Sequence, residues 1–156
     1  MTTSRSDVPG RSSPELVAST PLRVEEVMTR TVVTLTADQS FQEALALIAS
    51  SRFRHLVVVD TAGRLTGVLS DRDLLRFMSR ESHWDGATVA GVMKPQPITA
   101  RPETLLSAAA AEMVTRRINC LPVVDEEDRV CGIVTSTDLM RVFHRVQEWI
   151  EQVATK

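Results

Sequence analysis

The chain has 156 residues, of which 43% are hydrophobic and 24% are charged, and its formal net charge is −2. A chain of this length can bury one shared core, and its slightly negative charge argues against a broad basic surface for nucleic acid. Tyrosine is absent and aromatic residues make up only 4% of the chain, so an aromatic platform for stacked bases is not expected either.

Residues 1–20 are rich in Ser, Thr, Pro and Gly, a composition typical of a flexible tail. They contain no apolar stretch of the signal-peptide type, and no apolar run in the chain reaches the roughly 18 residues of a membrane span. The two cysteines, Cys120 and Cys131, fall in strand-like segments and are expected to be buried and reduced. These features favour a cytoplasmic protein with no membrane partner.

The first predicted strand covers Val32–Thr36, and the helix after it begins beyond Ser40. Ser40 and Glu43 fit the S-x-x-E capping box, in which each side chain hydrogen-bonds the backbone of the other residue. The run "HLVVVD" is apolar enough for a strand that is buried on both faces. A turn at 61–64, a third strand at 65–70 and a closing helix at 71–80 complete the unit.

The same order returns sixty-five positions later without a gap. "GVLSDRDLLRF" at 67–77 is matched by "GIVTSTDLMRV" at 132–142, and the first strand is matched by "PITAR" at 97–101. A period this long indicates a duplicated unit, here β-α-β-β-α twice. We therefore predict an α/β fold of two repeats about a pseudo-twofold axis, with helices covering mixed sheets. The predicted parts are a tail (1–20), a first repeat (21–80), a linker (81–90), a second repeat (91–147) and the end of the last helix (148–156).

Each repeat opens its closing helix with a hydroxyl residue and, three positions on, an aspartate: Ser70 and Asp73, then Thr135 and Asp138. The plainest interpretation is a capping box, in which the hydroxyl accepts from a backbone N–H and the carboxylate complements the helix dipole. The same geometry also suits a nucleotide. Phosphate binds free N–H groups at a helix start, and an acidic residue accepts hydrogen bonds from a ribose diol.

Three pairs of segments match between the repeats: "VMT" and "VMK" at the start of each repeat, "LVVVD" and "LPVVD", and "GVLSDRDL" and "GIVTSTDL". In these segments and in the duplication, the chain resembles a tandem pair of CBS domains. This is the cystathionine β-synthase type of domain, and the resemblance covers about Leu22–Arg145. It implies a regulatory module, not an enzyme, with clefts for adenine nucleotides such as AMP, ADP or ATP and no tightly bound cofactor. Some members bind NAD or S-adenosylmethionine instead. Members commonly form homodimers, and this chain would signal to an effector protein.

Carried over position by position, the resemblance implies two clefts, each joining the helix start of one repeat to a wall from the other. The clefts are unlike, because Arg72, which could pair with phosphate, corresponds to Thr137. Arg54 and His55 are alternative cations for the second motif. These residues can also be explained without a ligand: Arg72 as a solvated charge on its helix, and Arg54 and His55 as a cap at the edge of a strand. One cleft would use Thr135, Thr137 and Asp138 with Val33, Phe53, His55 and Val57, and the other Ser70, Arg72 and Asp73 with Ile98, Ile118, Cys120 and Pro122.

Other functions have less support in the sequence. The His and Cys residues lack metal-ligand spacing, and Ser70 has no evident histidine partner for nucleophilic catalysis. The main alternative to a nucleotide sensor is a structural or adaptor homodimer with vestigial clefts. A homodimer has separate support, because the closing helices carry more apolar residues than one core-facing stripe requires. These residues are Leu74, Leu75, Phe77 and Met78 in the first repeat and Leu139, Met140, Val142 and Phe143 in the second, and Val146, Trp149 and Val153 continue the second stripe as either packing or dimer surface.

Overall fold

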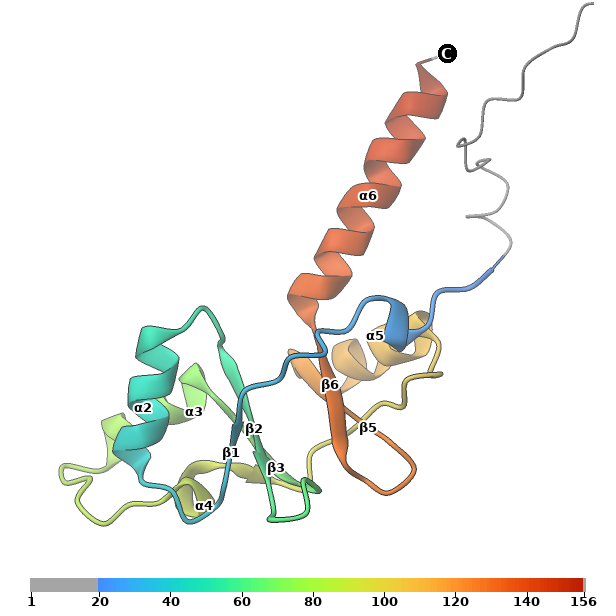
Figure 1. Cartoon of the computed structure of the whole chain (residues 1–156). Coiled ribbons are helices and arrows are strands. Elements are labelled where there is room, and N and C mark those ends of the chain that lie inside the picture. The colour runs from blue at the N-terminus through green and yellow to red at the C-terminus, as the bar shows by residue number, and fades with distance from the viewer. Residues whose placement is uncertain (1–19, 156) are drawn as a thin grey trace, which may run out of the picture.

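The computed structural model describes residues 20–155, and both repeats follow the predicted order of elements (Figure 1). The tail predicted over residues 1–20 lies outside the described residues except for Thr20. Within the described part, no helix is long and apolar enough to cross a membrane. The first repeat contains η1 (Val24–Glu26), β1 (Thr34–Leu35), α2 (Phe41–Ser50), β2 (His55–Val59), β3 (Leu65–Ser70) and α3 (Asp71–Arg80), and the second contains α4 (Val89–Val92), β4 (Lys94–Pro95), α5 (Leu106–Arg116), β5 (Cys120–Val124), β6 (Val130–Thr135) and α6 (Ser136–Ala154).

Two mixed sheets share one plan, as predicted. The first has the order β1-β2-β3-β4, in which β1 and β2 are parallel and the other neighbours are antiparallel. The second consists of the antiparallel pair β5 and β6. Ala100 bridges Val123 in parallel, as β1 does in the first sheet, and Thr29 bridges Ile133 in antiparallel, as β4 does. Each bridge falls at the position that the sixty-five-residue offset requires.

The first strand of each repeat is shorter than predicted. The segment expected over Val32–Thr36 forms a strand only at Thr34–Leu35, although the Val57 N–H still donates to the Val33 carbonyl over 3.3 Å. The strand expected over 97–101 is reduced to one bridge at Ala100, whose N–H donates to the Pro122 carbonyl over 3.0 Å. Pro97 has no N–H with which to extend that pairing.

The opening segment of each repeat packs into the core of the other repeat. Val24 of η1 is fully buried in a cluster with Leu121 and Val134 of the second repeat, and its N–H donates to the Thr104 carbonyl over 2.9 Å. Val89 of α4 is likewise fully buried, but among residues of the first repeat, and its N–H donates to Gln39 over 2.8 Å. Neither core is complete without the other repeat, so the two repeats form one folding unit.

A glycine in the third strand of each repeat permits this exchange. A Cβ built on Gly67 would lie 2.5 Å from the Met93 sulfur and 3.0 Å from the Lys94 carbonyl oxygen. A Cβ on Gly132 would lie 2.6 Å from the sulfur of Met28 in the same way. Glycine is therefore needed at both positions for close approach of the crossing segment, and not for a special backbone conformation.

A third apolar cluster joins the two sheets across the pseudo-twofold axis. It consists of Val57 and Val68 from the first sheet and Cys120 and Ile133 from the second, all at most 8% exposed. Val68 and Ile133 are equivalent positions of the two repeats. This cluster holds the two sheets together and thereby sets the relative orientation of the two repeats.

The closing helix α3 is more fully packed than the sequence predicted. Leu74 is 1% exposed, and the ring of Phe77 lies 4.9 Å from that of Phe41, so Phe77 belongs to the core of the first repeat. Met78 packs partly against the same core, and of this set only Leu75 is largely exposed, at 63%. Phe77 is thus partly used in packing against Phe41 of α2, and Leu75 is the exposed apolar side chain of the predicted α3 surface.

Helix α6 behaves differently and leaves the body of the protein (Figure 1). Leu139 and Val142 pack against the core of the second repeat, but the apolar residues beyond them have no such support. The interpretation of this stripe as packing on its own repeat is wrong beyond Val142. The exposed large apolar side chains of α6 are Met140, Phe143, Val146, Trp149, Ile150 and Val153, with exposed fractions of 40% to 62%.

Candidate functional site

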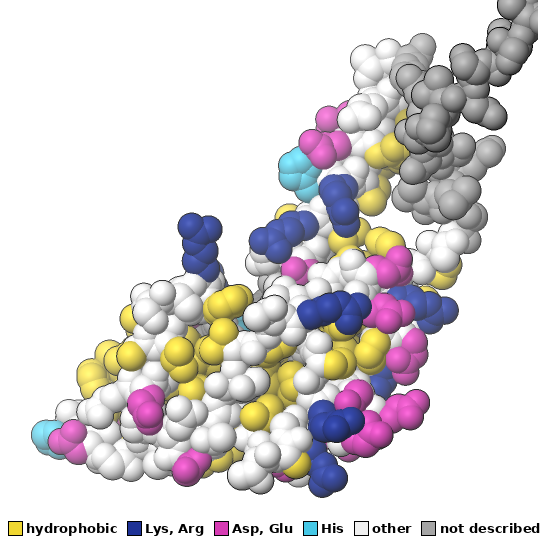
Figure 2. Space-filling model, in the orientation of Figure 1, with side chains coloured by type: hydrophobic (Ala, Val, Ile, Leu, Met, Phe, Trp, Pro, Cys, Tyr) yellow, Lys and Arg dark blue, Asp and Glu magenta, His cyan; other side chains and the backbone are white. Residues whose placement is uncertain are grey.

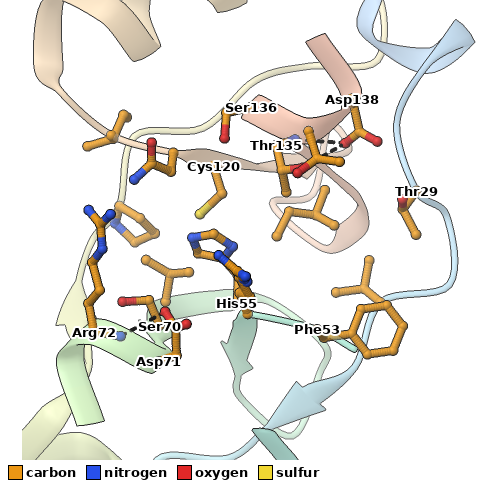
Figure 3. Close-up of a pocket in the computed structure, with 18 of the residues that line it drawn as sticks. Thr29, Phe53, His55, Ser70, Asp71, Arg72, Cys120, Thr135, Ser136 and Asp138 are labelled. Atoms are coloured by element: carbon orange, nitrogen blue, oxygen red, sulfur yellow. Dashed lines mark hydrogen bonds between the residues drawn. The ribbon is translucent and has the colours of Figure 1, made fainter. Parts of the chain in front are cut away.

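One cavity of about 690 Å³ lies between the two repeats and spans both predicted clefts. Figure 3 shows Ser70 and Arg72 at one end and Thr135 and Asp138 at the other, with His55 between them. All lining positions except Thr31 correspond in pairs under the sixty-five-residue offset. The predicted clefts are therefore the two ends of one continuous space, which we name the Asp73 end and the Asp138 end.

Twelve of the fourteen residues that the resemblance implied line this cavity. The other two, Val57 and Pro122, are buried within β2 and β5, where Val57 supports the wall from beneath without reaching the cavity. Each lies two residues along its strand from a lining residue, His55 or Cys120, on the same face of the strand and farther along it than the cavity reaches. The twelve lining residues are Val33, Phe53, His55, Ser70, Arg72, Asp73, Ile98, Ile118, Cys120, Thr135, Thr137 and Asp138.

At the Asp73 end, the predicted capping box is formed. Asp73 Oδ2 accepts from the Ser70 N–H at 2.8 Å and from the Ser70 hydroxyl at 2.7 Å, and Ser70 Oγ accepts from the Asp73 N–H at 3.2 Å. The other carboxylate oxygen, Oδ1, lies 3.5 Å from Lys94 Nζ and 4.0 Å from a guanidinium nitrogen of Arg76. Asp73 is only 7% exposed, so both of its oxygens already interact with protein groups.

The same capping box is formed at the Asp138 end, but with one cation fewer beside the carboxylate. Asp138 Oδ2 accepts from the Thr135 N–H at 2.8 Å and from the Thr135 hydroxyl at 3.2 Å. Oδ1 lies 3.4 Å from a guanidinium nitrogen of Arg141, which is itself 73% exposed. The position equivalent to Lys94 is Thr29, which lines the same end without a charge (Figure 3). This carboxylate therefore has one cation beside it, Arg141, which donates a hydrogen bond to Oδ1.

The two helix starts also differ in their backbone donors. The first N–H of each helix is used in the same way, since Asp71 donates to the Arg54 carbonyl and Ser136 to the Asn119 carbonyl, both over 3.0 Å. At α3 the next N–H, that of Arg72, also donates to Asp71 Oδ1 over 2.8 Å. A phosphate at this helix start would therefore meet a second donor that is already used and a carboxylate beside it. At α6 the corresponding residue is Ser136, so no carboxylate stands beside the Thr137 N–H from that position. The anion site expected at both helix starts therefore has support at α6 alone.

The cavity is strongly basic in a chain whose formal net charge is −2. Seven Lys or Arg side chains and three Asp side chains line it, an excess of four positive charges. Figure 2 shows Lys and Arg side chains on both rims of the hollow between the first repeat and the base of α6. Such a concentration of one sign attracts a polyanion. The basic residues are Arg52, Arg54, Arg72, Arg76, Lys94, Arg117 and Arg141, and the acidic ones are Asp71, Asp73 and Asp138.

His55 and Cys120 lie between the two ends (Figure 3). Burial lowers the pKa of His55 below its ordinary value, although the nearby carboxylates of Asp71 and Asp73 oppose the shift. The imidazole is therefore largely neutral near pH 7, and of the two cations expected here only Arg54 is permanently charged. Burial raises the pKa of the Cys120 thiol to about 12, so Cys120 is an inert thiol. Both cysteines are free, as predicted, but Cys131 is only partly buried, so the expectation that both are buried is met by Cys120 alone.

Sequence reasoning missed several basic residues of the site. Arg52 and Arg117 are identical in the two repeats, as are Arg76 and Arg141, and all four line the cavity. A charge retained at equivalent positions of a duplicated unit was the signal that could have identified them. Lys94 gave no such signal, because its counterpart is neutral and its segment crosses to the other repeat.

The family model of the CBS domain matches residues 24–80 and 89–145. Among curated relatives, L-aspartate semialdehyde sulfurtransferase of Methanocaldococcus jannaschii is 29% identical over 90% of this chain and 27% of its own length. The arabinose 5-phosphate isomerase KpsF of Escherichia coli is 33% identical over 74% of this chain and 36% of its own length. The chain thus spans about a quarter to a third of the curated relatives it matches.

Solved structures with the same fold contain adenosine-type ligands. The CBS domain pair of protein MJ0100, in complex with 5′-methylthioadenosine and S-adenosyl-L-methionine, is 28% identical, with a TM-score of 0.74 over 80% of this chain and 98% of that one. CBSX2 in complex with AMP is 27% identical, with a TM-score of 0.72 over 80% and 97%. The cytosolic domain of the Mg²⁺ channel MgtE in complex with ATP is 32% identical, with a TM-score of 0.65 over 77% and 48%.

Proposed function

This chain belongs to the CBS domain family, and from that premise we propose that it is a non-enzymatic regulatory module that binds an adenine nucleotide between its two repeats. The observation that carries the proposal is a single basic cavity with a hydroxyl-x-x-Asp helix start at each end. Its output passes to an effector protein, through which the cell's energy state could be sensed.

Each part of a nucleotide has a matching group in the cavity. The carboxylates of Asp73 and Asp138 are suited to the two hydroxyls of a ribose, since a charged acceptor makes the stronger hydrogen bonds. The surrounding arginines are suited to phosphate oxygens, and the apolar side chains of Val33, Ile98 and Ile118 to the face of a base. AMP and ATP, which the similar structures contain, have this composition.

The charge of the cavity separates nucleotides from the alternative adenosine ligand. S-adenosylmethionine, which the MJ0100 pair binds, carries a positive sulfonium where AMP or ATP carries phosphate. An excess of four positive charges around the cavity repels the first and attracts the second. NAD carries two phosphates and is compatible with the same charge, so it remains the second ligand class.

An adaptor with vestigial clefts is the alternative from another class, and one observation favours it. Both aspartates already satisfy a capping box, so their presence is explained without any ligand. Arg76, Lys94 and Arg141 pair with the same aspartates. The other basic lining residues form no ion pair with the described residues, and these are Arg52, Arg54, Arg72 and Arg117. That excess favours the sensor.

The test is a ligand screen on the full chain. AMP, ADP, ATP, NAD and S-adenosylmethionine are each added in a thermal-unfolding assay, and any that shift the midpoint are measured by calorimetry. A ligand at about 100 times its dissociation constant stabilises the folded state by roughly 2.7 kcal/mol. A shift with nucleotides and none with S-adenosylmethionine is expected. A flat response to all five ligands at millimolar concentration would favour the adaptor.

We also propose that the chain forms a homodimer through the exposed stripe of α6. Phe143 and Met140 are 57% and 62% exposed, and the stripe continues to Val153 at spacings of three and four residues. Arg145 and Glu148 flank its centre. Two copies packed antiparallel would place Arg145 against Glu148 of the partner subunit, and the apolar stripes against each other. A ligand that changes the angle between the copies could then be detected by an effector.

Light scattering at micromolar concentration tests this assembly, for which a mass near 17.2 kDa would mean a monomer. Phe143→Asp is expected to dissociate the dimer without unfolding the protomer. Val114→Asp is the matched control, because Val114 is 78% exposed on α5 and lies outside the α6 stripe. A Phe143→Asp variant that stays dimeric would show that α6 is the wrong surface.

A further inference from the structure

The two ends of the cavity contain matched groups with only a few chemical differences. Both have a capped aspartate, and both have an arginine three residues later, Arg76 or Arg141, beside the outer carboxylate oxygen. Three differences lie nearest the aspartates: Lys94 stands where the other end has Thr29, Asp71 where it has Ser136, and Arg72 where it has Thr137. The formal charges of Asp71 and Arg72 cancel, so that pair adds no net charge relative to Ser136 and Thr137.

Lys94 occupies the carboxylate oxygen that a ligand would need. Its ammonium lies 3.5 Å from Asp73 Oδ1, while Oδ2 is used by the helix cap. Lys94 is held there by its backbone, because β4 pairs with β3 and places Lys94 opposite Val68. A ribose diol at this end must therefore compete with two cations, Lys94 and Arg76, both more than half exposed. At the Asp138 end, Thr29 occupies the equivalent backbone position opposite Ile133 and supplies no charge, so Asp138 Oδ1 has one ion-pair partner, Arg141, which donates to it over 3.4 Å.

Asp71 opposes a phosphate at the same end. Its carboxylate accepts from the Arg72 N–H at 2.8 Å, which is the donor that an anion at the start of α3 would use. A phosphate there would also meet a second negative charge within the same turn. Ser136 removes both obstacles at α6. Two separate side chains thus disfavour the ribose and the phosphate at one end only.

From these contacts we infer that the two ends are nucleotide sites of unequal affinity. The Asp138 end is the primary site, and Lys94 and Asp71 weaken nucleotide binding at the Asp73 end. This inference rests on the proposed function, since it ranks two ends of the proposed site. The primary site combines the Asp138 carboxylate with the helix start of α6. The Asp73 end fills second, at higher nucleotide concentration, which widens the range over which one chain responds.

Calorimetric titration with AMP, in wild type and in Asp→Asn variants, tests the ranking. Asn keeps the cap but loses the charged acceptor, so Asp138→Asn should weaken the tighter binding phase by about tenfold. Asp73→Asn should act mainly on the weaker phase. Equal effects of the two changes, or a tighter phase governed by Asp73, would overturn the inference.

An exchange of the distinguishing residues gives the sharper test. The variant T29K/D71S/K94T/S136D keeps the composition and net charge of the chain and should transfer the tighter phase from Asp138 to Asp73. If that variant fails to fold by circular dichroism, K94T alone should tighten the weaker phase by about threefold to fivefold, because one partly exposed ion pair is removed.

The outcomes separate this inference from the proposed function. If wild type binds AMP but the exchange leaves the tighter phase with Asp138, or K94T leaves the weaker phase unchanged, the ranking is wrong and the nucleotide module stands. If wild type binds none of AMP, ADP, ATP or NAD, the proposed function fails and this inference fails with it.

Discussion

Replacing Gly67 with alanine tests the crossing of the opening segments. The new Cβ would lie 2.5 Å from the sulfur of Met93 and 3.0 Å from the carbonyl oxygen of Lys94. Comfortable contact needs about 3.5 Å or more, so the sulfur must move by about 1 Å and the β4 backbone by several tenths of an ångström. Overpacking of this kind costs about 1–3 kcal/mol, and a change of 1 kcal/mol shifts the melting temperature by roughly 2–4 °C in a chain of this size.

Urea unfolding followed by circular dichroism measures this cost. Gly91→Ala is the matched control, because a Cβ there meets nothing within 4 Å, and its α4 position should tolerate alanine or gain stability. Combining Gly67→Ala with Met93→Ala should cost less than the sum of the single changes, since the flexible side chain is the nearest obstacle. If Gly67→Ala and Gly91→Ala have the same stability within about 0.5 kcal/mol, the close approach of β4 to β3 is not real.

Two further predictions concern cooperativity and pH. Val24→Ala, in the opening of the first repeat, should remove about 2 kcal/mol of stability. It should lower the unfolding midpoint equally by circular dichroism and by the fluorescence of Trp84, which lies in the opposite core; separate midpoints would mean that the repeats unfold independently. Because the pKa of His55 is lowered in the folded protein, the unfolded chain takes up the proton more readily. His55 therefore destabilises the fold progressively as pH falls from about 6.5 toward its lower folded-state pKa. A bound phosphate favours the charged imidazole, so nucleotide affinity should instead rise as pH falls from about 7.5 to 6. Both pH effects should be smaller in His55→Gln, and unchanged profiles in that variant would assign them to other groups.

The duplicated pattern predicted the fold and the local geometry well. The offset of sixty-five residues correctly predicted two equivalent units, and the hydroxyl-x-x-Asp motifs correctly predicted the caps at Ser70 and Thr135. These predictions worked because a helix cap and a buried strand depend on residues that are neighbours in the sequence. The site residues carried over from the resemblance came mostly from the same motifs, and twelve of them share one cavity.

Features that depend on contacts between distant segments were not predictable in this way. No local pattern indicates that Val24 completes the core of the second repeat, or that Lys94 reaches Asp73. In the sequence of α3, Phe77 is one apolar residue more than a single core-facing stripe requires, and only the approach of Phe41 from α2 explains its position. The merging of two clefts into one cavity likewise follows from the orientation of the two sheets, which the cluster around Val57 and Ile133 sets.

The crossed opening segments also impose an order on folding during synthesis. The ribosome makes the chain from its N-terminus, and domains usually fold as they emerge. Here the first repeat cannot close its core when its own last helix, α3, has appeared, because Val89 has not yet been made. The second repeat can close its core as soon as it is made, because Val24 has been synthesised before it. A nascent chain paused between Arg80 and Val89 therefore exposes two unfinished apolar surfaces, one on each side of the future boundary, and is the stage at which a chaperone or a neighbouring nascent chain is most able to bind.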